Sequence, residues 1–283
     1  MTTYADLVAD VRERLSSSLT DELNTLAAPY TPGDASITLS YDARKMAPGT
    51  VLTCGTNTWY VLSWNNATMT AQILAGIDGA PSLAAAAGDV VRIGPRFTDW
   101  SIFKNIRDQI AAMGTSENGL GILNFWVDLA NYDTNLYVPP TGVVPQRIRA
   151  AYGKSGPRWY PVRRWSWEVG AIHVYDESSF AEFTFVYQDD FTLPTLLTQD
   201  PVADSGLSST MLDIPVLGAA AMLMLGKESQ RNQIAAQGDT RRAAEVTAGA
   251  NIGTAREWLR MRDQRIADEY SRMVNASSII GGA

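Results

Sequence analysis

The spacing of apolar residues changes several times along the chain, and each change predicts a different kind of element. Near the N-terminus, Thr3-Tyr-Ala-Asp6 has the form of a capping box, with Asp in place of the usual Glu. It is followed by apolar residues at helical spacing, namely Leu7, Val8, Val11 and Leu15. Asp21 and Glu22 would suit the first turn of a second short helix that ends before Pro29, so we predict N-terminal helices over residues 1–33.

From Ser36 the apolar period falls to two, which is typical of strands. Two apolar runs on either side of Gly55-Thr-Asn57 predict a hairpin, and Asn65-Asn66 predicts another turn because Asn tolerates left-handed backbone. A last apolar run ends at Ile93. About five short strands in so short a stretch predict a small barrel or rolled sheet over residues 34–96.

A single helix is predicted after this sheet and links it to the rest of the chain, over residues 97–116. Thr98 is its expected N-cap, and Phe97 with Ile102 fits a hydrophobic staple. Gly114 is the expected end of the helix. Between these ends the apolar residues form one stripe, which consists of Phe103, Ile106, Ile110 and Met113.

Residues 117–203 are rich in aromatic side chains and alternate like strands, so we predict a second, sandwich-like β module there. Its sharpest constellation is Arg158-Trp-Tyr-Pro-Val-Arg-Arg-Trp-Ser-Trp167. Arg interleaved with Trp and Tyr could stack on sugars or on single-stranded bases. The same residues could instead form a protein interface, or belong to a β core with Arg on its outer face. For an interface, the candidates are Arg158, Trp159, Trp165 and Trp167.

Residues 204–283 are predicted to form a helical region with a flexible end of small residues, because no proline follows Pro215. Near its end, apolar residues recur at intervals of seven, at Ile252, Leu259, Ile266 and Met273, and Trp258 widens the stripe. We call these five residues the seam. A narrow apolar seam with charged flanks is typical of a helix that packs on a neighbour. The candidates for polar contacts to that neighbour are Arg260, Arg262 and Arg265.

Together these patterns predict an α+β fold with small N-terminal helices, two β modules and a C-terminal helical region. The 283 residues are 46% hydrophobic and 19% charged, a balance that allows a buried core. The net charge of −7 argues against sequence-specific DNA binding, because an acidic chain repels phosphate. A passive conduit for DNA is compatible with this charge.

The residues required for bond-breaking chemistry do not converge anywhere in the sequence. The one histidine, His173, and the one cysteine, Cys54, lie outside any metal-binding or nucleophile motif. Adjacent acids such as Asp189-Asp190 point to opposite faces of a strand and cannot form a glycosidase dyad. A Ca²⁺ site at these two acids is a minor alternative. The sequence therefore favours a protein without enzymatic activity, cofactor or metal.

The sequence pattern contains no signal peptide and no obvious membrane span. Asp6 and Asp10 lie where a signal peptide would carry basic residues. The longest apolar stretch, Ile214 to Leu225, contains Pro215 and is shorter than the roughly 20 residues that a bilayer requires. We therefore expect a soluble protein that is made in the cytoplasm.

One segment has a counterpart in a known family. Thr68 to Ile93 runs through a strand, a turn at Gly76, a run of alanines at 84–87 and Gly88-Asp89 before its last strand. This order resembles a segment of the neck proteins of long-tailed bacteriophages, with Ala75 where the family usually has Arg. The helix that follows and the Arg- and Glu-rich final helix fit as well. Most of the chain thus resembles the head-to-tail adaptor (connector) proteins of actinobacterial siphophages.

The resemblance implies a virion protein at the head–tail junction, in a homo-oligomeric ring of typically about twelve copies beneath the portal. The C-terminal helical part would engage the portal protein, and a downstream neck or tail protein would complete the contacts. DNA would pass through the ring. Three other interpretations remain open. First, the chain could be another tail component, such as a tail terminator, tail tube or minor tail protein. Second, it could be a carbohydrate-binding module of a receptor-binding protein. Third, it could be a hydrolase.

Overall fold

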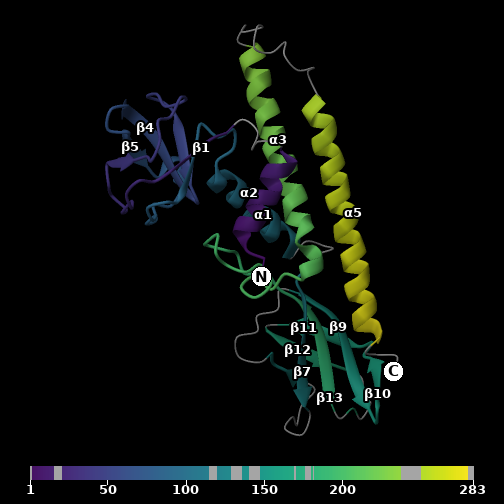
Figure 1. The fold of residues 1–283 in the computed structure, drawn as a ribbon. Helices are drawn as coiled ribbons and strands as arrows, with labels where there is room; N and C mark the ends of the chain where they lie inside the picture. Colours follow the sequence, from purple (N-terminus) through teal and green to yellow (C-terminus); the bar gives the residue numbers. More distant parts are fainter. Residues whose placement is uncertain are drawn as a thin grey trace. The chain divides into compact units, whose positions relative to one another are not determined.

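The computed structural model describes residues 2–15, 21–114, 120–128, 136–139, 147–168, 170–175, 180, 182–236 and 250–279. It is an α+β protein, which confirms the predicted class. The chain divides into two compact units (Figure 1). Unit 1 comprises Met1–Gln109 and Leu193–Arg262, and unit 2 comprises Ile110–Thr192 and Asp263–Ala283.

The first helix of unit 1 is α1 (Tyr4–Arg14), and its predicted capping box is confirmed. The backbone N–H of Thr3 donates to Asp6 Oδ2 at 2.7 Å, and the N–H of Asp6 donates to Thr3 Oγ1 at 3.4 Å. The Thr3 hydroxyl also donates to Asp6 Oδ2, and the two hydrogen bonds that the carboxylate accepts from the Thr3 N–H and hydroxyl lower the pKa of the Asp6 carboxyl. The buried face of the helix consists of Tyr4, Leu7, Val8, Val11 and Arg12.

The predicted second helix within residues 1–33 is wrong. These residues instead form strand β1 (Glu22–Thr25), which pairs antiparallel with β6 (Val90–Ile93). Asp21 therefore precedes a strand and not a helix. Its fully buried carboxylate accepts a hydrogen bond from Arg12 Nη1 at 2.9 Å. Adjacent acids favour the start of a helix. Here this local preference is outweighed by the pairing of β1 with β6 and by the buried ion pair of Asp21.

The strands of the first β module form one curled sheet in the order β1-β6-β3-β4-β5-β2 (Figure 1). Its other members are β2 (Ser36–Thr38), β3 (Val51–Cys54), β4 (Asn57–Asn65) and β5 (Thr70–Ala75), and the short 3₁₀ helix η2 (Ile77–Gly79) follows β5. Two hydrogen bonds join the outermost strands, from Ala27 N to Thr38 O at 2.8 Å and from Ser40 N to Thr25 O at 2.9 Å. The sheet is thus curled into a half-barrel whose two edges are linked by these hydrogen bonds.

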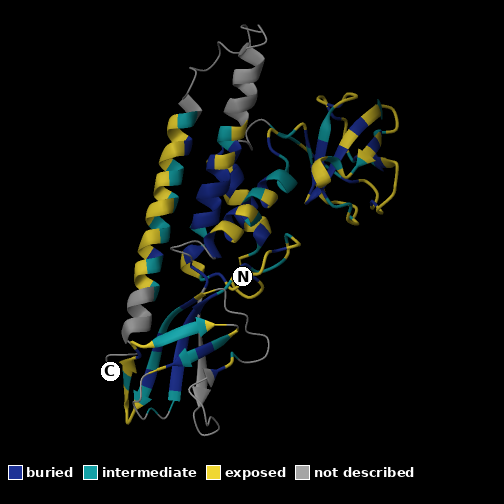
Figure 2. Cartoon of the chain, turned by 180° about the vertical axis from the view of Figure 1, so that it is seen from behind, coloured by how far each residue is buried: buried dark blue, intermediate teal, exposed yellow. Residues whose placement is uncertain are grey.

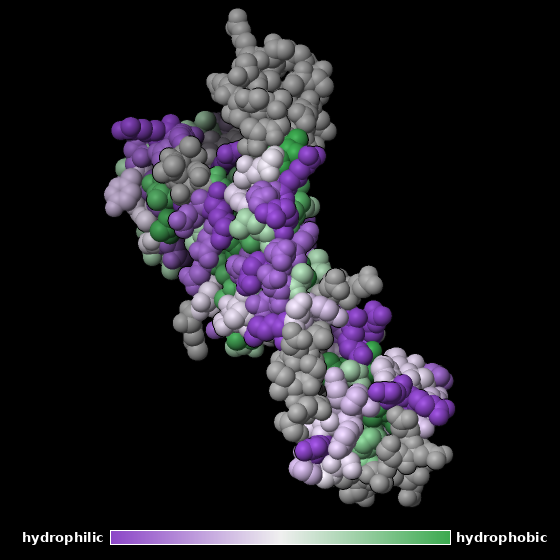
Figure 3. All heavy atoms as spheres, turned by 90° about the vertical axis from the view of Figure 1, so that its right-hand side faces the viewer, coloured by the Kyte–Doolittle hydropathy of each residue, from purple (hydrophilic) through white to green (hydrophobic). Residues whose placement is uncertain are grey.

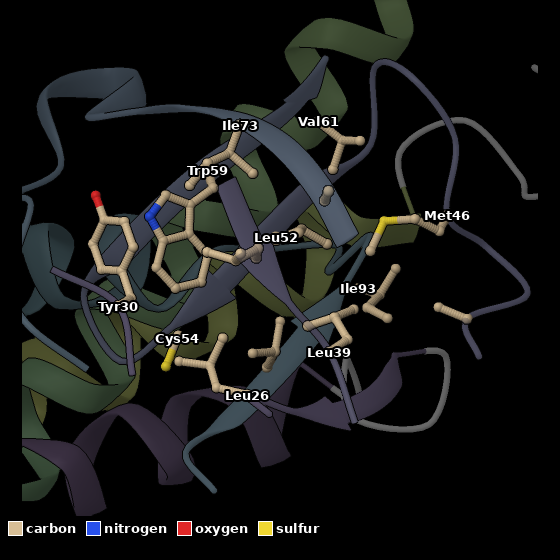
Figure 4. Packing of buried hydrophobic residues seen from close by; sticks show 14 residues of the cluster. Leu26, Tyr30, Leu39, Met46, Leu52, Cys54, Trp59, Val61, Ile73 and Ile93 are labelled. Carbon is tan, nitrogen blue, oxygen red and sulfur yellow. The ribbon is translucent and has the colours of Figure 1, made fainter. Parts of the chain in front are cut away.

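The predicted hairpin between β3 and β4 is confirmed, with Gly55 in the left-handed conformation at φ 56°. The barrel encloses one apolar core, in which the ring of Trp59 packs edge-on against Tyr30 with centroids 4.9 Å apart (Figure 4). Cys54 is part of this core, so it serves as a small apolar side chain. The largest other members are Leu26, Leu39, Leu52, Ile73 and Ile93.

A buried cluster of two arginines and two aspartates ties the barrel to the helices of unit 1. The guanidinium of Arg12 on α1 donates to Asp21 before β1 and to Asp99 at the start of α2. Arg92 on β6 approaches Asp21 at 3.8 Å. Removing one partner from such a cluster is costly, since it leaves an unpaired charge away from water.

Helix α2 (Asp99–Gly114) begins where the sequence predicted, with the Ser101 N–H bonded to Thr98 Oγ1 at 3.0 Å. The predicted apolar stripe is buried at every one of its positions, Phe103, Ile106, Ile110 and Met113. At the C-terminal end, the Gly114 carbonyl accepts a hydrogen bond from Gln188 Nε2 at 2.9 Å.

The C-terminal region is helical as predicted. The 3₁₀ helix η4 (Ser209–Met211) precedes α3 (Asp213–Ala236), and α5 (Ala250–Ile279) is the final helix. Helix α3 packs against α1, and residues 214–221 are all buried. By length and composition alone, Ser209–Gly226 could cross a membrane, and half of this window is buried within the protein.

Unit 2 contains the aromatic β module, which consists of two sheets. The strands are β7 (Ile122–Asp128), β8 (Leu136–Tyr137), β9 (Arg147–Ser155), β10 (Arg158–Pro161), β11 (Trp165–Glu168), β12 (Ala171–Val174) and β13 (Glu182–Gln188). One sheet has the order β10-β9-β13-β7 and the other β11-β12-β8. Residues of both sheets share one core, with Phe183 and Phe185 of β13 packed against Tyr137 of β8. The module is therefore sandwich-like.

Candidate functional site

The seam of α5 is the candidate site that the structure describes best. Ile252, Trp258, Leu259, Ile266 and Met273 are all partly buried, and none of them is fully enclosed. Between residues 252 and 273, the buried residues are Ala255 and Glu269. Figure 3 shows the side of the molecule on which α5 lies, where hydrophilic residues predominate. The apolar stripe is therefore covered in part by the chain itself, and each of its residues keeps some surface in contact with solvent.

The three arginines predicted to contact a neighbour differ in their surroundings. Arg260 is exposed and pairs with Glu257 one turn away, with 2.6 Å between Arg260 Nη2 and Glu257 Oε1. This hydrogen bond lowers the pKa of Glu257. Arg265 lies 3.5 Å from Glu269, which is buried and also bonded by Arg272. Arg260 is thus the member of the set that is most open to a partner.

Arg262 makes a contact that the sequence did not predict. Its Nη1 donates to Gln109 Oε1 on α2 at 2.7 Å, and Gln109 is buried. The Gln109 side chain also lies against Gly218 of α3, where an added Cβ would come within 2.1 Å of Oε1. One buried glutamine therefore joins three helices of unit 1. In the sequence, Gln109 is a polar residue beside Ile110 and one turn after Ile106, within the apolar stripe of α2. This position could have identified Gln109 as a buried contact residue.

The structure places the residues of the aromatic constellation on two different sheets. Arg158 and Trp159 are on β10, at the edge of the four-stranded sheet, where Lys154 Nζ lies 5.5 Å from the Trp159 ring centroid. Trp165 and Trp167 are on β11 of the other sheet, and both pack against the sandwich core. Much of the aromatic surface of these two tryptophans is therefore used inside unit 2. A contact between these residues and a partner stays a prediction.

The remaining candidates for chemistry lie apart from one another. His173 on β12 stacks on Tyr175, with ring centroids 6.3 Å apart. Burial raises the pKa of the Cys54 thiol to about 12, and the negative charges of Asp89 and Asp99 add to this effect. Within the described ranges, no three His, Cys, Asp or Glu side chains are grouped as metal ligands would be. Asp189 and Asp190 therefore have no third acidic ligand among those residues.

Comparison with models of protein families finds no match for this chain, and comparison with curated protein sequences finds none either.

Proposed function

We propose that this chain is a structural virion protein, which forms a ring at the neck of a long-tailed phage. The ring would join the portal of the head to the tail and let DNA pass. The observation that carries the proposal is the half-covered seam of α5, together with the resemblance to head-to-tail adaptor proteins. The role requires large surfaces that meet fixed neighbours, and it requires no pocket for a small molecule.

The half-covered seam needs a partner for an energetic reason. A helix is held in a protein mainly by burying its apolar face, because isolated helices are marginal in water. In α5 the seam residues Leu259 and Ile266 keep part of their surface in contact with solvent. Docking on another chain would remove this surface from water, at about 25 cal/mol for each Å² of apolar area.

The portal is the partner that the resemblance implies for the C-terminal helical part. The exposed ion pair of Arg260 and Glu257 would lie beside the docked seam. Such exposed pairs contribute little to stability, so their side chains can exchange partners when a second surface arrives. We therefore assign the seam to portal docking, with Arg260 as its most accessible polar residue.

The proposal is tested by measuring the mass and location of the chain in purified particles. We expect the chain at the head–tail junction, with about twelve copies in each particle. A stoichiometry near six or three would favour a tail tube, tail terminator or minor tail protein instead. Absence of the chain from the particles would contradict a virion role altogether.

A further inference from the structure

The part of the chain that contains β9 and β10 is strongly basic, although the protein as a whole is acidic. Residues 134–167 include six Lys or Arg and no Asp or Glu. We call these residues the basic block. Since the whole chain holds 23 Lys and Arg against 30 Asp and Glu, the residues outside the block carry a net charge of −13. So uneven a distribution of charge within one chain is typical of a contact with a polyanion.

Most of the cations of the basic block lie at the surface of unit 2. Two of the six are partly buried and bonded within the unit. Arg149 Nη2 donates to Gln188 Oε1 at 2.7 Å, and Lys154 Nζ donates to Glu182 Oε2 at 2.9 Å. The other four are exposed, namely Arg147, Arg158, Arg163 and Arg164. The block therefore presents positive charge to the solvent, and only part of its charge is used to hold the sandwich together.

Three of the exposed arginines follow the edge of the four-stranded sheet. Strand β10 is the outer strand of the order β10-β9-β13-β7, and only one described strand, β9, pairs with it (Figure 1). Arg158 is its first residue, and Arg163 and Arg164 come shortly after its last residue, Pro161. We call these three arginines the β10 edge. Arg158 and Arg163 are at most roughly 18 Å apart along the chain, since five extended residues span no more.

The aromatic residues of the block decide which kind of polyanion it suits. Single-stranded nucleic acids and sugars are held by stacking on open aromatic rings. Trp165 and Trp167 pack against the sandwich core, and Trp159 is half-buried with Lys154 Nζ 5.5 Å from its ring centroid. Tyr160, at 45% exposure, is the more open ring on β10. The block thus offers positive charge more than stacking surface, and double-stranded DNA, with its phosphates outside and its bases stacked inside, requires charge alone.

The spacing of charge also favours a duplex over an acidic protein. Duplex DNA carries one negative charge for about every 1.7 Å of its axis, so unevenly spaced arginines each find a phosphate. An acidic protein surface would need carboxylates at matching positions. Strand β9 pairs with β13 from Lys154 to Arg147, so the β9–β10 hairpin is not a free ribbon that could enter the major groove. Its contacts would therefore be made to the phosphate backbone, which carries no sequence information directly.

We infer that the β10 edge binds the phosphate backbone of double-stranded DNA without reading its sequence. This inference rests on the proposed function for the source of the duplex, because a neck ring lets DNA pass. The acidic remainder of the chain repels phosphate, so the contact is weak and is confined to the basic block. A weak contact at a few arginines guides a duplex and still allows it to move.

The test measures binding of the full chain to a fluorescent duplex of random sequence at several salt concentrations. The logarithm of the affinity should fall linearly with the logarithm of the salt concentration, with a slope of about −3 for three phosphate contacts. Arg158→Gln should weaken binding about tenfold in dilute salt and reduce the steepness of the slope by about 1. Arg158→Lys should bind like the wild type, since a phosphate accepts either cation. Arg256→Gln is the matched control, because Arg256 is an exposed arginine of α5 outside the block.

Thermal unfolding checks that each variant folds, and Arg164→Gln is a second variant with the same expectation as Arg158→Gln. The inference is overturned if the wild-type chain shows no salt-dependent binding, or if Arg256→Gln loses as much affinity as Arg158→Gln. Tighter binding of a single-stranded oligonucleotide or of poly-glutamate than of the duplex would also overturn it, and would assign the β10 edge to stacking or to an acidic protein. The assay uses the isolated chain, so its failure is distinct from absence of the chain from particles, which tests the neck role.

Discussion

Helices α3 and α5 follow one another along the chain, but they bury very different shares of their residues (Figure 2). In α3, residues 214–221 form an unbroken buried run. In α5, the buried residues between 252 and 273 are Ala255 and Glu269, and the seam is half covered. A helix that is apolar on all sides belongs to a core, whereas a narrow stripe with charged flanks belongs to an interface.

Under the proposed neck role, the two helices have separate tasks. Substitutions in α3 should act on folding, because its side chains fill the core of unit 1. Substitutions on the seam of α5 should act on docking and leave folding almost unchanged. A seam substitution that unfolds the chain, or a core substitution in α3 without effect on stability, would show that the two helices do not differ in this way.

The largest effect is expected for Ile214→Ala in α3. Ile214 is fully buried, so its truncation should lower the free energy of unfolding by about 2–5 kcal/mol. The same truncation on the seam, Ile266→Ala, should cost less than about 1 kcal/mol, because Ile266 is already partly solvated. Urea unfolding of both variants provides the measurement. Equal losses would remove the distinction between the two helices.

An intermediate effect is expected for Gly218→Ala, also in α3. The added Cβ would overlap the side chain of Gln109, which would have to move away from Gly218. Overpacking of this kind costs about 1–3 kcal/mol. The melting temperature should fall accordingly, and Gly226→Ala serves as the control, because a Cβ at Gly226 meets no atom within 4 Å. A Gly218→Ala chain as stable as the wild type would show that Gln109 is not held in place.

The smallest effects on stability are expected for two arginines of α5, which differ in their contacts. Arg262→Met removes the hydrogen bond to buried Gln109 and should cost about 1–2 kcal/mol. Arg260→Met removes an exposed pair with Glu257 and should leave the unfolding midpoint unchanged. Chemical denaturation resolves the difference. Because Gly218→Ala and Arg262→Met both act through Gln109, their combined cost should be less than the sum. Full additivity would argue against the shared contact.

Local patterns predicted much of the fold. The capping box at Thr3, the hairpin at Gly55 and the N-cap at Thr98 each depend on a few neighbouring residues, and the structure confirms all three. Strand β1 was mistaken for a helix because its identity depends on β6, which lies far away along the chain. Asp21 forms a buried ion pair with Arg12, and the spacing of these two residues in the sequence does not predict it.

The candidate site was predictable in part. The seven-residue spacing of the seam identified α5 as an amphipathic helix, and the half-covered seam is consistent with that interpretation. The contact of Arg262 with Gln109 could not be predicted, because it joins helices that are distant in the sequence. Trp165 and Trp167 pack on a core formed by both sheets, and sequence alone does not show which sheet a short strand joins.

The proposed neck role requires that another protein of the virion covers the α5 seam. Leu259→Asp tests this claim most directly, with Met261→Asp as the matched control, because Met261 is an exposed residue of the same helix outside the seam. The measurement is the number of copies of the chain per DNA-filled head, after each variant replaces the wild type. We expect wild-type numbers for Met261→Asp and none for Leu259→Asp, although both chains remain folded at the temperature of the assay. Wild-type incorporation of a folded Leu259→Asp chain would show that the seam does not dock on a protein of the virion.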